Sequence, residues 1–96
     1  MEMRDRIRRL RNEIVHAAAC SGARDVRIFG SVARGEERAD SDVDFLVSLE
    51  ANRTLLDLAR LEIALERLLQ RPVEVMTEKE LPPLVREIAK REAIPV

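Results

Sequence analysis

Two aspartates separated by a single residue are the clearest chemical feature of the sequence. Asp42 and Asp44 fall in a β-rich run. Because strand side chains alternate between faces, both carboxylates are expected on one face, about 6.6 Å apart along the strand. Val43, Phe45 and Val47 then face the core. Mg²⁺ combines one or two carboxylates with substrate phosphates and water, so the pair predicts a site for a metal–nucleotide complex.

A glycine and a serine come earlier, at the end of another predicted strand. Gly30-Ser31 is expected to open a short helix, where backbone N–H groups point outward and the glycine lets a phosphate approach. Ser31 adds a hydroxyl donor, and Arg34 adds a planar fork of donors one turn later. These residues predict a cradle for the tail of a triphosphate. Arg34 could equally pair with Glu37 or Asp40 on the surface.

A third carboxylate could complete the metal site. Glu74 lies between Val73 and Val75 in a further β-rich run, so it points to the face opposite its apolar neighbours. A third ligand would allow two metal ions about 3.5–4 Å apart, one activating an attacking hydroxyl and one stabilising the departing pyrophosphate. Taken alone, Glu74 fits an exposed charge on an edge strand equally well.

The elements expected around these residues alternate between helices and strands. Apolar residues at helical spacing predict a first helix that ends at about Ala19 and a second that begins after Thr54 and ends before Pro72. β-rich runs predict three strands, at residues 26–29, 43–47 and 73–75.

A last helix is expected to open at Pro82-Pro83, with Leu84, Val85 and Ile88 facing inward, before the chain runs out extended. The order of elements predicts one domain over residues 1–96, of the α/β (α+β) two-layer class. A small mixed sheet would carry helices on one face, and the metal site would lie on its exposed face.

Composition limits the partners that the domain can have. The chain has 17 basic and 18 acidic residues and only two aromatic residues, both Phe, so direct nucleic-acid binding is not expected. No apolar run reaches membrane-spanning length and the start of the chain has no apolar signal core, so we expect a cytoplasmic protein without membrane contact. Cys20 is expected to be a small buried residue, and His16 to have a surface or packing role.

The spacing of these residues resembles that of a known superfamily. Gly30-Ser31, ten residues, and then Asp42-Val43-Asp44 is similar to the nucleotidyltransferase motif of the DNA polymerase β-like superfamily. Ala33-Arg34-Gly35 and Ser41 further resemble the minimal nucleotidyltransferase branch, whose members act as antitoxins to HEPN-domain toxins.

The resemblance implies a polymerase β-like nucleotidyltransferase fold and assigns roles to the matching residues. Gly30, Ser31, Arg34 and Ser41 would bind the nucleotide, and Asp42, Asp44 and Glu74 would be the catalytic metal ligands. The third carboxylate is usually Asp in the family, and Glu74 is one methylene longer.

The expected function is transfer of AMP from ATP to a hydroxyl, with Mg²⁺ (two ions) as cofactor. The acceptor would be a Tyr or neighbouring hydroxyl of a HEPN toxin, which the modification silences. One alternative is a non-catalytic antitoxin that neutralises its partner by occlusion. Another is a nucleotidyltransferase that acts on RNA or on a small molecule. Assembly as a homo-oligomer or hetero-oligomer is left open.

Overall fold

A four-stranded mixed sheet forms the centre of the protein, and the computed structural model describes residues 2–96 around it. In chain order the elements are α1 (Met3–Arg9), α2 (Arg11–Cys20), β1 (Ala23–Phe29), α3 (Gly30–Arg34), β2 (Val43–Leu49), α4 (Leu55–Leu69), β3 (Val73–Met76), the 3₁₀ helix η1 (Glu78–Glu80), α5 (Pro83–Glu92) and β4 (Ile94–Pro95).

The strand order is β3-β2-β1-β4, with β2 and β3 parallel and the other neighbours antiparallel. The helix α4 connects the two parallel strands, as a parallel crossover requires. The register places Asp44 of β2 beside Glu74 of β3 on one side and beside Phe29 of β1 on the other. Because paired residues share a face, the two acidic side chains project from the same face of the sheet.

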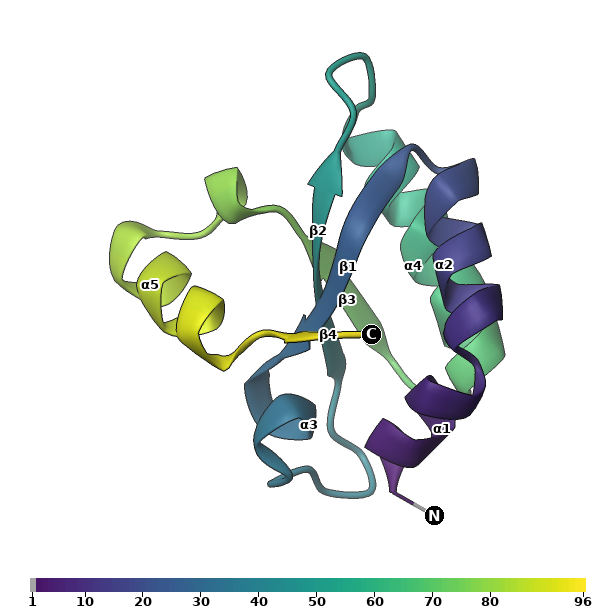
Figure 1. The fold of residues 1–96 in the computed structure, drawn as a ribbon, viewed down its shortest axis with the longest axis vertical. Helices are drawn as coiled ribbons and strands as arrows, with labels where there is room; N and C mark the ends of the chain where they lie inside the picture. The colour runs from purple at the N-terminus through teal and green to yellow at the C-terminus, as the bar shows by residue number, and fades with distance from the viewer. Residues whose placement is uncertain (1) are drawn as a thin grey trace.

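The main core lies on the opposite face, under α1, α2 and α4, which stand together on the right in Figure 1. Phe45, Leu61, Leu65 and Ile14 are among its fully buried side chains. Leu58, Leu61, Leu65 and Leu69 recur at helical spacing along α4, so one stripe of that helix meets the sheet. Burial of apolar surface, to which this stripe contributes, is the dominant favourable term in folding.

A smaller cluster covers part of the face that carries Asp44. Phe29 and Leu46 of the sheet pack there against Leu81 and Ala89 of the segment that follows β3. This contact holds α5 on the left of the sheet in Figure 1, away from α2 and α4. The α+β fold class predicted from the sequence is therefore confirmed, with the addition that α5 covers part of the otherwise open face.

Most of the predicted helices and strands are present, but they begin or end at residues other than those predicted. The first helix is divided at Leu10 into α1 and α2, because Leu10 leaves helical geometry at ψ 14°. Thr54 caps α4 as predicted: its hydroxyl accepts from Leu56 N, and its own N–H donates to Asp57. The extended end of the chain forms β4, a strand of only two residues beside β1.

Two expectations about burial are wrong. Leu84, Val85 and Ile88 of α5 are exposed, because the helix approaches the sheet through the small side chain of Ala89 and its larger residues point away. Cys20 is exposed as well, since it lies on the solvent side of the last turn of α2, with its Sγ 3.7 Å from Nε2 of the exposed His16.

The helices are all too short or too polar to cross a bilayer, as far as the described residues extend.

The outer edge of β3 is closed by α4. Glu66 accepts a hydrogen bond from Val73 N at 3.2 Å, and Glu62 accepts one from Val75 N at 2.8 Å. These carboxylates occupy backbone donors that an edge strand would otherwise leave open. Because β3 carries Glu74, the same contacts help to position this residue on the face of the sheet that carries Asp44, which we call the acidic face.

We expect the double variant Glu62→Ala/Glu66→Ala to lower the free energy of unfolding by about 1–3 kcal/mol, since two β3 donors lose charged acceptors. Denaturant unfolding measures this directly. The matched control is Glu87→Ala on α5, an exposed glutamate that accepts no hydrogen bond within residues 2–96. Equal stability of the double variant and the control would mean that the edge contacts contribute nothing.

Candidate active site

Asp44 is the centre of the candidate site. It lies on β2, half-buried, with Glu74 beside it on β3 and the start of α3 beyond Phe29. Within residues 2–96 its carboxylate forms no ion pair. A partly desolvated carboxylate without a cation is unfavourable in the folded state, which is typical of a site built for a ligand.

Gly30 lies directly against this carboxylate. Its backbone has a φ of +74°, and a Cβ placed on it would overlap Oδ2 of Asp44. Glycine is therefore required here both for the backbone conformation and for the close approach. The junction of β1 and α3, predicted as the phosphate cradle, is in contact with the predicted metal ligand.

Ser31 follows in the first turn of α3 and is partly exposed. Its carbonyl accepts from Glu36 N at 2.9 Å, which folds the chain back after the helix, while its hydroxyl has no protein partner within residues 2–96. The left-handed Gly35, at φ 72°, ends the helix. The hydroxyl of Ser31 is therefore available to a bound phosphate.

The other two carboxylates flank Asp44. Asp42 is exposed and lies one residue before β2 begins, and Glu74 is exposed on β3 in register with Asp44. Burial, together with the negative charges of Glu74 and Asp42, raises the pKa of Asp44 to about 6, and the positive charge of Arg34 opposes the shift. The three predicted ligands therefore lie near enough to repel one another.

The donor set suits a hard divalent cation, because it consists of carboxylate oxygens beside a side-chain-free glycine. As placed, however, no three His, Cys, Asp or Glu side chains of residues 2–96 are gathered tightly enough to hold a metal ion. The site therefore has the oxygen donors that a divalent cation prefers, but its carboxylates are spread apart.

Arg34 is engaged in two ion pairs. Its Nε donates to Glu36 at 3.0 Å and its Nη1 donates to Glu92 of α5 at 2.9 Å. The sequence suggested Glu37 or Asp40 as alternative partners, and neither is the residue that it contacts. Binding of a phosphate by Arg34 stays a prediction and would require exchange of one of these carboxylates.

Ser41 belongs to the loop that leads into β2. Its hydroxyl accepts from Arg38 N at 2.7 Å, and its carbonyl accepts from Arg71 at 2.7 and 3.1 Å. Its predicted contact with nucleotide stays a prediction. Arg71, which the sequence analysis did not single out, holds this loop and also reaches Glu37 at 3.6 Å. No local pattern marks it, because its partners lie 30 or more residues away.

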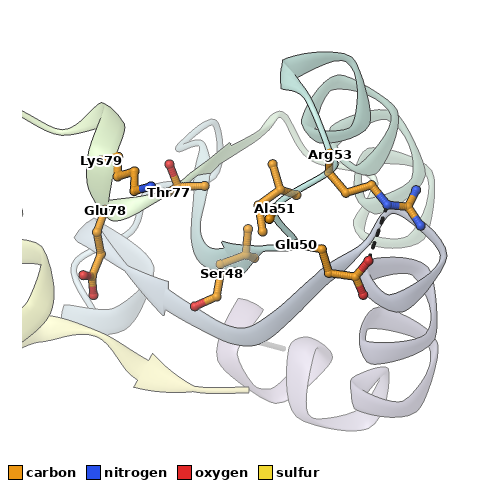
Figure 2. Close-up of a pocket in the computed structure, with 9 residues that line it drawn as sticks. Ser48, Glu50, Ala51, Arg53, Thr77, Glu78 and Lys79 are labelled. Atoms are coloured by element: carbon orange, nitrogen blue, oxygen red, sulfur yellow. Dashed lines mark ion pairs between the residues drawn. The ribbon is translucent and has the colours of Figure 1, made fainter.

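A separate cavity of about 390 Å³ opens at the far end of β2, shown in Figure 2. Its lining is mixed, and its polar residues include Ser48 and Glu50 on one side and Thr77 and Lys79 on the other. The buried Leu46 separates it from Asp44 along the strand. The cavity is therefore not continuous with the candidate site.

A mixed sheet with paired carboxylates beside a glycine-opened helix fits a nucleotidyltransferase, and comparisons with known proteins show the family. The nucleotidyltransferase domain model matches residues 7–96. The chain belongs to the nucleotidyltransferase domain family, which uses a nucleoside triphosphate and a divalent metal ion. The resemblance carried by Gly30-Ser31 and Asp42-Val43-Asp44 is thereby confirmed.

Two curated relatives cover most of the chain. A protein of Methanocaldococcus jannaschii, provisionally named protein adenylyltransferase MJ0435, is 36% identical over 90 residues, which are 94% of this chain and 97% of that protein. Protein adenylyltransferase MntA of Thermococcus cleftensis is 39% identical over 73 residues, which are 76% of this chain and 74% of that protein.

Solved structures share the fold. A structure provisionally described as a minimal nucleotidyltransferase has a TM-score of 0.87 and 50% identity, covering 100% of this chain and 97% of that one. A chain of a toxin–antitoxin structure with AMP-PNP has a TM-score of 0.74 at 16% identity, covering 88% of this chain and 69% of that one. The second match shows the fold alone.

The pKa of Asp44 predicts how the stability of the metal-free protein depends on pH. Its pKa is about 6 when folded against a reference value of 3.8, so the unfolded state loses the proton first as the pH rises. Stability therefore falls between about pH 4 and pH 6 and stays lower above that range.

We expect Asp44→Asn to raise the free energy of unfolding in EDTA by about 1–2 kcal/mol at pH 7.5, a figure reduced because solvent screens a half-exposed group, and to change it little at pH 4. Denaturant titrations at both pH values measure this. The control Asp40→Asn changes an exposed loop carboxylate and should match the parent. If Asp44→Asn instead destabilises the protein at pH 7.5, Asp44 is a structural residue.

Proposed function

We propose that this nucleotidyltransferase is a protein adenylyltransferase that moves AMP from ATP to a hydroxyl of a partner protein and acts as the antitoxin of a HEPN-domain toxin. The observation that carries the proposal is the half-buried Asp44, in register with Glu74 and in contact with the glycine that opens α3. The names of both curated relatives and the toxin–antitoxin fold neighbour support it.

A tyrosine acceptor must come from outside this chain. The chain has no Tyr, so a tyrosine acceptor belongs to another protein. The candidate site lies on the face of the sheet that the main core leaves open, where a partner can approach. A location in the cytoplasm, and the absence of direct nucleic-acid contact, stay predictions from the sequence.

In the proposed reaction the acceptor oxygen forms a bond to the α-phosphorus of ATP, the bond to the bridging oxygen breaks, and pyrophosphate leaves. Gly30 and Ser31 would hold the triphosphate through a backbone N–H and a hydroxyl. Asp44 and Glu74 project from the same face of the sheet, and a carboxylate there is a base that could take the hydroxyl proton.

Asp42 and Asp44, with Glu74 as third carboxylate, would hold the divalent ion, which is Mg²⁺ in this proposal. When bound, the ion stabilises charge on the transferring phosphate and lowers the pKa of the attacking hydroxyl. Its binding would also offset the burial and the neighbouring negative charges that together raise the pKa of Asp44.

A second candidate is an antitoxin that blocks its partner by binding alone. One observation favours it: within residues 2–96 no three acidic or other ligating side chains are gathered tightly enough for a metal ion. The two candidates differ in whether the partner gains mass.

We expect the chain, incubated with ATP, Mg²⁺ and its proposed HEPN-domain partner, to add AMP to that protein and not to itself. Intact-mass spectrometry detects the addition. EDTA or Asp44→Asn should abolish it, because each removes the proposed metal site, while Asp40→Asn should transfer normally. Inhibition of the partner with no gain in mass would favour blocking by occlusion.

Substitution of Glu74 tests whether a third carboxylate takes part in the reaction. If it takes part in hydroxyl activation, Glu74→Gln should lower kcat by about 100-fold or more with little change in the KM for ATP, because the triphosphate is held elsewhere. Glu74→Asp restores the shorter acid that is usual in the family and should keep substantial activity. Parent-like rates for Glu74→Gln would make this residue an ordinary surface charge.

A further inference from the structure

The helix α5 exposes large apolar side chains that the fold does not use. Leu84, Val85 and Ile88 are 74%, 44% and 45% exposed, and their spacing places them on one side of the helix. We call these three residues the α5 ridge. Only Ala89 of this helix is buried, so the ridge contributes little to the core.

A second apolar stripe provides a comparison. On α4, Leu55, Leu56 and Ile63 are 67%, 60% and 51% exposed. This helix, however, covers the face of the sheet opposite the acidic site, as Figure 1 shows. Exposure alone therefore does not separate the two surfaces, whereas their positions relative to Asp44 do.

The ridge leads toward the candidate site. Val85, Ile88 and Glu92 follow one another at steps of three and four and so form one stripe along α5. At the end of this stripe, Glu92 binds Arg34 of α3 at 2.9 Å, and α3 begins at the glycine that touches Asp44. A protein seated on the ridge would therefore be held beside the acidic face.

The side of α5 that packs on the sheet is held on the face that carries Asp44. Ala89 and Leu81 pack against Phe29 and Leu46, which neighbour Asp44 along the sheet. The hydrophobic contact and the ion pair together fix the ridge relative to the carboxylates, as positioning of a second substrate requires.

We propose that the α5 ridge is the docking surface for the acceptor protein, which would present an apolar patch next to its reactive hydroxyl. This inference rests on the proposed function. The exposed Glu87 and Arg91 lie beside the apolar ridge on α5, and an apolar centre with charged residues at its edge is usual for a protein-binding surface.

A substrate is a better occupant than a second copy of this chain. Three partly exposed side chains fall far short of the roughly 800 Å² that each partner buries in a stable interface. An acceptor has to leave after transfer, and a small apolar contact beside the site suits such a transient encounter.

The test measures binding separately from transfer. In the background of Asp44→Asn, without metal, the dissociation constant for the proposed HEPN-domain partner is measured by calorimetry. Leu84→Ser/Ile88→Ser changes the ridge, and Leu56→Ser/Ile63→Ser makes the same kind of change on α4. Circular dichroism and thermal unfolding confirm that both variants fold.

We expect the ridge variant to weaken binding by about 10-fold or more and the α4 variant to leave it within about twofold. In the catalytically intact protein, the ridge variant should raise the KM for the acceptor and leave the KM for ATP unchanged. Parent-like binding, equal weakening by both variants, or no binding by the parent would overturn the inference. A parent dimer that only the ridge variant dissociates would also overturn it, by assigning the ridge to a second copy.

Binding lost with the ridge variant while the parent transfers no AMP would support the docking surface and contradict the proposed function. If the parent transfers AMP while the ridge variant binds the partner as tightly as the parent does, the result would support the proposed function and contradict the docking surface.

Discussion

The partial burial of the Asp44 carboxylate beside other carboxylates is the constraint on which the rest of the structure depends. The parallel register of β2 and β3 brings Asp44 beside Glu74, and Asp42 adds a third negative charge at the start of β2. This arrangement disfavours the folded state without a cation. The apolar core on the other face opposes it, and Glu62 and Glu66 of α4 hold the outer edge of β3.

The two faces of the sheet thus contribute differently to the protein. One face, under α1, α2 and α4, carries most of the buried apolar surface and provides stability. The other face keeps its acidic end open, while Leu81 and, from α5, Ala89 cover part of it by packing on Phe29 and Leu46. Because the small second cluster buries only Ala89 of α5, that helix exposes Leu84 and Ile88.

Features that depend on local sequence could be predicted, and those that depend on distant contacts could not. The alternation around Asp44, the glycine at position 30 and the cap at Thr54 are local patterns, and each is present in the structure. The ion pair between Arg34 and Glu92 joins residues 58 positions apart, which no periodicity encodes. The amphipathic pattern of α5 indicated a helix, but its apolar side was assigned to the core when that side faces solvent.

The central claim, that a metal–triphosphate complex binds between the start of α3 and the acidic strands, is tested most directly by NMR with Mn²⁺ and a non-hydrolysable ATP analogue. Bound Mn²⁺ broadens signals from nearby nuclei. We expect the backbone amide signals of Gly30, Ser31, Asp44 and Glu74 to disappear when both ligands are present, while those around Ile63 of α4 persist. Broadening centred on Ser48 and Lys79, or no localised broadening at all, would contradict the claim.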